Sequence, residues 1–163
     1  MNLQNRRKFL RLGFLSSAVF IMQGCELFSV TNSSETIKVV QNDLFPKAKE
    51  LGVNTVNYIN IILRHSRINE AEKTFLKNGV KWLNESAVEL YGATYTKLSD
   101  AKRQLVLQNI AQTRWGGSWI DTMTRYILEA TLGDPVYGGN NKEAGWKWLG
   151  FEGGVPRPKK AYL

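Results

Sequence analysis

The chain has one cysteine and one histidine in 163 residues, Cys25 and His65. A single thiol cannot form a disulfide within the chain, so the fold must be stabilised in another way. The motif Cys-x-x-Cys-His is missing, which excludes covalently attached c-type haem. Cysteine, histidine and carboxylate residues also form no cluster with the spacing of metal ligands. The sequence therefore predicts no metal site in this chain.

Catalytic groups are also scarce. His65 lies at the end of an expected amphipathic helix, where a lone histidine is usually a helix-end or surface residue. Glu85 and Glu89 have i, i+4 spacing, which predicts a solvated pair on one helix face. The glycine-rich segment near the C-terminus follows a helix and does not link a strand to a helix, as a dinucleotide-binding loop would. We expect no catalytic residue and no cofactor-binding residue.

A long hydrophobic run is missing as well. The apolar stretch from Leu12 to Met22 has about 11 residues, or roughly 17 Å of helix, against about 30 Å for a bilayer core. It follows a paired-arginine head, Asn5-Arg6-Arg7-Lys8-Phe9-Leu10-Arg11, and precedes Gly24-Cys25. This order predicts a twin-arginine export signal over residues 1–24, with Arg6, Arg7, Phe9 and Leu10 as its key positions. The alternative is a Sec-type signal in which two arginines occur by chance.

Cys25 follows Gly24 at the end of the apolar run, which resembles the lipid acceptor of a bacterial lipoprotein. Residues 25–40, with their hydrophilic stretch Thr31 to Glu35, would then be a tether to a membrane leaflet. Met22-Gln23 departs from the usual lipoprotein pattern, so an uncleaved or differently cleaved signal with an incidental cysteine is the alternative. Both alternatives place the chain in the periplasm or on the periplasmic face of the cytoplasmic membrane.

The net charge of +8 comes partly from the export signal. Residues 1–24 contribute four of the 22 basic residues and none of the 14 acidic ones, so the rest of the chain has a net charge of +4. This modest excess removes the main argument for nucleic-acid binding, and we expect no nucleic acid as partner. The basic tail residues Arg157, Lys159 and Lys160 remain, and they suit a membrane surface or an acidic partner.

Apolar residues at spacings of three and four predict four helices. The first covers about 43–65, with Pro46 in its first turn, and the second covers about 69–91 and ends at Gly92. Ser99 is expected to cap a third over 100–112, with Leu105, Val106 and Ile110 facing inward. A fourth begins near Trp115 or Ser118 and ends at Leu132.

No useful strand alternation is present. The sequence therefore predicts an all-α protein, with a small bundle of about four helices over residues 41–132. The export signal precedes this bundle, and a Gly- and Trp-rich segment over 133–163 follows it.

The C-terminal segment combines glycines with large aromatic residues. Seven of the 14 glycines lie between Gly133 and Gly154, whereas a flexible spacer would lack large rings. We expect an ordered loop whose rings complete the core, contact a partner, or do both by turning inward and outward in alternation. In the core alternative, Asp134 and Asn140 hold turns through side-chain hydrogen bonds to the backbone.

A second cluster, Trp115-Gly116-Gly117-Ser118-Trp119, stands just before the fourth helix and is expected beside the first. The candidate partner-binding residues of both clusters are Trp115, Trp119, Asp134, Tyr137, Gly138, Gly139, Asn140, Trp146, Trp148 and Phe151.

Two blocks of sequence resemble a known family. The blocks Gly133-Asp134-Pro135-Val136-Tyr137-Gly138-Gly139-Asn140 and Gly145-Trp146-Lys147-Trp148-Leu149-Gly150-Phe151 are similar to the small third subunit of membrane-bound gluconate 2-dehydrogenase. The twin-arginine start and the helical middle fit the same family, so the resemblance covers essentially the whole chain. Glu152 departs from the pattern, because a proline often follows the Gly-Phe pair.

The resemblance implies an oxidoreductase complex of three parts facing the periplasm. A large flavoprotein subunit would oxidise a sugar or sugar acid on FAD, and a multihaem cytochrome c would pass the electrons to the quinone pool. In such families the flavoprotein can lack a signal of its own. The small subunit, itself without cofactor or catalytic site, would then bind the flavoprotein and escort it through the twin-arginine translocase. The alternative is a free-standing envelope lipoprotein that binds a small carbohydrate through Trp146 or Trp148.

Overall fold

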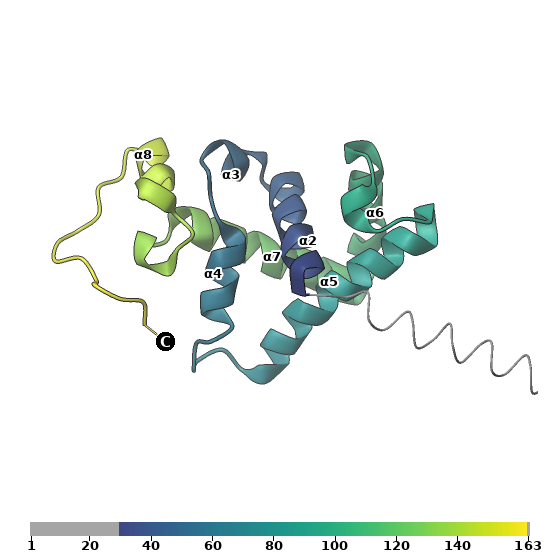
Figure 1. Ribbon diagram of the computed structural model, residues 1–163, viewed down its shortest axis with the longest axis horizontal. Helices are drawn as coiled ribbons and strands as arrows, with labels where there is room; N and C mark the ends of the chain where they lie inside the picture. The colour runs from purple at the N-terminus through teal and green to yellow at the C-terminus, as the bar shows by residue number, and fades with distance from the viewer. Residues whose placement is uncertain (1–29, 163) are drawn as a thin grey trace, which may run out of the picture. The chain divides into compact units, whose positions relative to one another are not determined.

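The computed structural model of this protein describes residues 30–162. Arg6, Arg7, Phe9, Leu10 and Cys25 lie outside the described residues, so the export signal and the lipidation site stay predictions. The described part of the chain is helical and has no strand, which confirms the all-α class. Figure 1 shows the order of its α-helices, which are α2 Val30–Leu44, α3 Pro46–Glu50, α4 Thr55–Ile62, α5 Glu70–Tyr91, α6 Asp100–Ala111, α7 Arg114–Leu132 and α8 Ala144–Leu149. Three 3₁₀ turns connect them: η1 Tyr95–Lys97, η2 Pro135–Tyr137 and η3 Asn141–Glu143.

The first predicted helix, over 43–65, is wrong as a single element. Helix α2 ends at Leu44, Pro46 begins the short helix α3, and α4 starts only at Thr55. Proline lacks the N–H that would continue α2. After α3, Gly52 adopts a left-handed φ of 65°, which prevents the helix from continuing into α4. The side chain of Asn54 caps α4 by accepting a hydrogen bond from the backbone N–H of Asn57 at 3.0 Å.

The tether predicted over 25–40 also needs correction, because the chain is helical from Val30 onward. Thr36 and Val40 of α2 are fully buried. Asn84 of α5 donates a hydrogen bond to the Thr36 hydroxyl at 3.3 Å, so this part of α2 belongs to the bundle. The hydrophilic stretch at 31–35 concealed the helical spacing of the apolar residues that follow it.

The second predicted helix is confirmed. Helix α5 covers Glu70–Tyr91, capped by the Asn69 side chain and ended by Gly92 at a φ of 69°. The third prediction matches α6 in extent, although Ser99 makes no side-chain capping bond. Val106 and Ile110 face the core as expected, but Leu105 is exposed and Leu107 is buried in its place.

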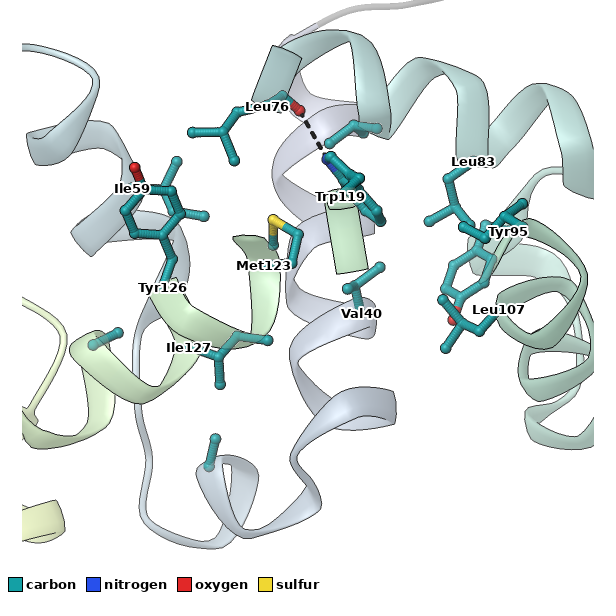
Figure 2. Packing of buried hydrophobic residues seen from close by; sticks show 14 of the residues in the cluster. Val40, Ile59, Leu76, Leu83, Tyr95, Leu107, Trp119, Met123, Tyr126 and Ile127 are labelled. Atoms are coloured by element: carbon teal, nitrogen blue, oxygen red, sulfur yellow. Dashed lines mark hydrogen bonds between the residues drawn. The ribbon is translucent and has the colours of Figure 1, made fainter. Parts of the chain in front are cut away.

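The core is built around Trp119 of α7, which is fully buried (Figure 2). Its indole N–H donates to the backbone oxygen of Leu76 in α5 at 3.3 Å. The indole lies against Gly79, where any Cβ would collide with it. Met123, Tyr126 and Ile127 continue the buried face of α7. Glycine at position 79 therefore lets α5 and α7 pack closely around the largest side chain of the core.

A polar network connects the C-terminal end of α2 to α5, η1 and α6. Arg103 of α6 contacts both carboxylate oxygens of Asp43, at 2.7 and 3.0 Å. The Tyr95 hydroxyl donates to the same carboxylate at 2.7 Å, and the Tyr95 backbone N–H donates to the Asn84 side chain. Because these charges are largely buried and fully paired, the network fixes the register of α2 against α5 and α6.

Candidate partner-binding surface

The C-terminal segment folds back on the end of α7 and contains more regular structure than the predicted loop. Residues 144–149 form α8, preceded by η2 and η3. Two glycines allow the close approach to α7. A Cβ on Gly139 would collide with Ala130, and one on Gly145 would collide with the backbone of Thr131. The segment is thus ordered, and Gly139 and Gly145 serve its packing against α7.

Asn140 holds this segment from inside. It is 1% exposed, and its amide nitrogen donates to the Gly133 oxygen at 3.0 Å. Its amide oxygen accepts from the Gly145 N–H at 2.8 Å. Asp134 holds the preceding turn by accepting from the Val136 N–H at 2.9 Å. Both side chains therefore hold turns through backbone hydrogen bonds, as the core alternative predicts.

Arg157 fastens the tail of the chain across this segment. Its guanidinium pairs with Asp134 at 3.1 Å and with Glu143 at 3.0 Å, and it lies 4.4 Å from the ring centroid of Trp146. Burial alone would raise the pKa of Asp134, but the Val136 N–H and Arg157 outweigh it and lower that pKa below its usual value. The basic tail was expected to face a membrane or an acidic partner, yet Arg157 is used within the fold.

The two tryptophans of α8 differ in burial: Trp146 faces the bundle and Trp148 is open to solvent. This fits the alternative in which some rings turn inward and others outward. Trp146 is 8% exposed, and its indole N–H donates to the Leu132 oxygen at 2.6 Å. Arg157 lies over its ring and Phe151 packs against it at an interplanar angle of 75°, so the buried Trp146 cannot stack on a sugar. Trp148 is 45% exposed and packs on one side against Phe45, with 6.1 Å between ring centroids.

Tyr137 and Gly138 contact α4 instead of facing solvent freely. The Asn57 side chain donates to the Gly138 oxygen at 3.1 Å, and Tyr137 meets the Tyr58 ring edge-on at 6.4 Å. Tyr58 in turn donates to Glu129 at 2.8 Å. Burial, and then that hydrogen bond to a carboxylate, raise the pKa of Tyr58 far above its usual value. Tyr137 and Gly138 are half-buried, and their contacts with Asn57 and the buried Tyr58 join the C-terminal segment to the bundle.

The predicted neighbourhood of the two aromatic clusters is wrong. Residues Trp115 to Trp119 lie in the first turns of α7, whereas the C-terminal segment packs at its other end. At 1.5 Å per residue, Trp115 and Leu132 are about 25 Å apart along the axis. Trp119 is fully buried in the core and has no surface to offer a partner.

Three apolar side chains of α8 and the residues just after it remain open to solvent, and we call them the α8 face. It consists of Trp148, Leu149 and Phe151, each between 45% and 56% exposed, with Phe45 packed behind Trp148. Sequence reasoning found Trp148 and Phe151 from their type and spacing. It missed Leu149 and Phe45, and Phe45 joins the group only through its tertiary ring contact with Trp148. Large exposed rings on an ordered support are typical of protein–protein contacts.

The described residues give little support for metal binding or catalysis. Residues 30–162 contain no group of three or more metal-binding side chains. A hollow of about 700 Å³ between α2 and the start of α4 is lined by Lys38, Lys49, Glu35 and several amides. These side chains do not form a nucleophile–base pair. No helix of this part combines the length and apolar character needed to span a bilayer.

Comparison with known protein families identifies a match. The model of the family described as gluconate 2-dehydrogenase subunit 3 matches residues 32–154, which include the bundle, the buried glycines and the α8 face. Neither a curated protein nor a solved structure matches the chain.

Proposed function

Because this chain belongs to the gluconate 2-dehydrogenase subunit 3 family, we propose that it is the noncatalytic small subunit of an FAD-dependent sugar-acid dehydrogenase complex. The family name is that of a subunit, so the chain works as an accessory part of a multisubunit dehydrogenase. In this proposal it binds the flavoprotein subunit before export and escorts it through the twin-arginine translocase. The completed complex, with its multihaem cytochrome c, then faces the periplasm.

The observation that carries this proposal is the α8 face. Trp148, Leu149 and Phe151 expose apolar area on a segment that Asn140 and Arg157 hold in place. A preordered surface loses little conformational entropy on binding, which favours a stable contact. Tryptophan and other large side chains near the centre of an interface commonly supply most of its binding free energy. This face suits contact with the flavoprotein.

The binding test is purification of the tagged, full-length chain from native membranes, with an absorbance scan for flavin. We expect the wild-type chain to retain a stoichiometric flavin-bearing polypeptide. The double variant Trp148→Ala/Phe151→Ala should bind the flavoprotein about thirtyfold more weakly and retain much less flavin, because truncating interface residues of this kind typically costs about 2 kcal/mol or more. The control Val155→Ala/Tyr162→Ala changes two side chains that are 88% and 78% exposed outside the α8 face, and should retain flavin normally.

A colourless wild-type monomer would contradict the proposal and favour the free-standing lipoprotein. A carbohydrate screen by tryptophan fluorescence would then follow, with Trp148 as the stacking candidate and Trp148→Ala as the control, because the ring of Trp146 is covered.

The escort role has a separate test in the export signal. The variant Arg6→Lys/Arg7→Lys should leave the small subunit bound to the flavoprotein but confine both to the cytoplasm, since it changes the signal and not the α8 face. Dehydrogenase activity is measured in the cytoplasmic and periplasmic fractions. Normal activity in the periplasmic fraction would show that the escort role is wrong.

A further inference from the structure

A second aromatic surface lies on α5 and the start of α7, and α7 extends about 25 Å from there to the end on which α8 packs. Phe75 and Trp82 are seven residues apart and share one face of α5. Their rings meet edge-on at 6.3 Å, and Trp82 meets Trp115 of α7 at 5.3 Å. All three side chains are half-buried, so each keeps part of its ring at the surface. We call this group the α5 ridge.

Hollows flank the ridge on both sides of Trp82. One, of about 450 Å³, is lined by Glu70, Ala71, Thr74, Phe75, Asn78 and Trp82. The other, of about 310 Å³, is lined by Trp82, Glu85, Ser86, Glu89 and Trp115. Their centres are separated by roughly 15 Å, or about three turns, along α5. An amphipathic helix laid beside α5 presents apolar side chains at such intervals.

The charged residues that line the second hollow are both acidic. Glu85 and Glu89 are exposed at its rim, and within the described residues Glu89 forms no ion pair. Glu85 is paired only loosely with Lys81, at 3.7 Å. Neither Lys81 nor Arg114, the neighbouring basic residues, lines the hollow. A lysine or arginine on a bound segment would be attracted to this rim.

We infer that the α5 ridge docks a basic amphipathic helix of a partner subunit. Apolar side chains of that helix enter the two hollows on either side of Trp82, and its basic residues face Glu85 and Glu89. The inference rests on the proposed function in one respect, that the chain works inside a complex. It adds a contact separate from the α8 face, which lets the small subunit hold its partners at both ends of α7.

The test is the composition of the purified complex when the rim charge is reversed. The variant Glu85→Lys/Glu89→Lys changes two exposed side chains and should preserve the fold. We expect it to retain at least one partner polypeptide about tenfold less than wild type does. The matched control Glu35→Lys/Glu50→Lys makes the same charge change at exposed positions that line neither hollow, and should retain every partner.

Salt provides a second readout. About 1 M NaCl shortens the screening length to about 3 Å. It should therefore release from the wild-type complex the same polypeptide that the reversed rim releases.

A photo-reactive phenylalanine at Asn78 or Ser86 places a cross-linker at each hollow in the otherwise wild-type complex. Both positions should cross-link to one segment of a partner subunit, and that segment should contain lysine or arginine. Cross-links to lipid only, or a reversed-rim complex with the composition of the control, would overturn the inference. If no flavoprotein copurifies even with wild type, it is the proposed function that has failed.

Discussion

Gly79 shows how a single residue determines the packing of this bundle. The indole of Trp119 occupies the space where a side chain at position 79 would begin, and its N–H reaches the Leu76 oxygen one turn earlier. Glycine inside a helix costs up to about 1 kcal/mol relative to alanine. Here that cost is offset by the burial of the largest side chain in the core.

We therefore expect Gly79→Ala to destabilise the protein although alanine favours helix. Overpacking of this kind typically costs about 1–3 kcal/mol, measured as a fall in the urea midpoint. Gly154→Ala is the control, since its Cβ would meet nothing within 4 Å. Adding Trp119→Phe to Gly79→Ala should recover part of the loss in a double-mutant cycle. Equal stability of Gly79→Ala and wild type would contradict this account of the core.

At the scale of the element, α3 and α4 show why sequence periodicity misled. The apolar spacing from Val53 to Leu63 is helical, and Pro46 is tolerated in a first turn, so one long helix fitted the pattern. The structure instead uses Pro46 to start α3 and Gly52 with Asn54 to separate α3 from α4. Gly52 and Asn54 are individually ordinary, and their combined effect depends on the packing of α4 against α7.

The C-terminal segment depends on a few specific contacts. Arg157 bridges Asp134 and Glu143 and covers Trp146. These groups are partly solvent-exposed, so each ion pair contributes little to global stability. Their effect is local, because they keep the tail against the base of the α8 face.

We expect Arg157→Met to loosen the C-terminal segment without unfolding the bundle. Amide hydrogen exchange of residues 133–151 should become faster, because opening this segment no longer breaks two ion pairs. The free energy of unfolding should change by less than about 1 kcal/mol. Lys159→Met, at an exposed neighbour, is the control. Unchanged exchange in Arg157→Met would show that the glycine contacts and Asn140 hold the segment without it.

At the scale of the whole molecule, three buried hydroxyls couple stability to alkaline pH. Burial raises the pKa of Tyr58, Tyr95 and Tyr126, and their hydrogen bonds to carboxylates raise it further. In the unfolded chain these hydroxyls titrate near pH 10. Above about pH 10 the unfolded state therefore loses protons first, and the stability present at lower pH is progressively lost.

Tyr95→Phe tests this dependence. The variant should be less stable than wild type at pH 7, because Asp43 loses a hydrogen bond. Its stability should also fall less steeply between pH 10 and pH 11, by about one proton of slope, measured by urea unfolding at each pH. Parallel curves for the two proteins above pH 10 would contradict the role of the Tyr95 hydroxyl.

The molecule also presents two aromatic surfaces at the two ends of α7. The α8 face came partly from the sequence, since Trp148 and Phe151 stand out in a glycine-rich block. The α5 ridge could not be found there, because Phe75 and Trp82 read as ordinary members of a helix. They form the α5 ridge only because α7 packs beside α5 and brings Trp115 into contact with Trp82.

The sequence by itself determined the all-α class, the extent of α5, α6 and α7, and the family, because these depend on local spacing and on a specific Gly/Trp block. It left open whether the rings of the C-terminal block complete the core, contact a partner or do both. Only the tertiary structure decided that Trp119 is core, that Arg157 is used internally, and that α2 belongs to the bundle. These outcomes depend on contacts between residues far apart in the chain, about which local periodicity carries no information.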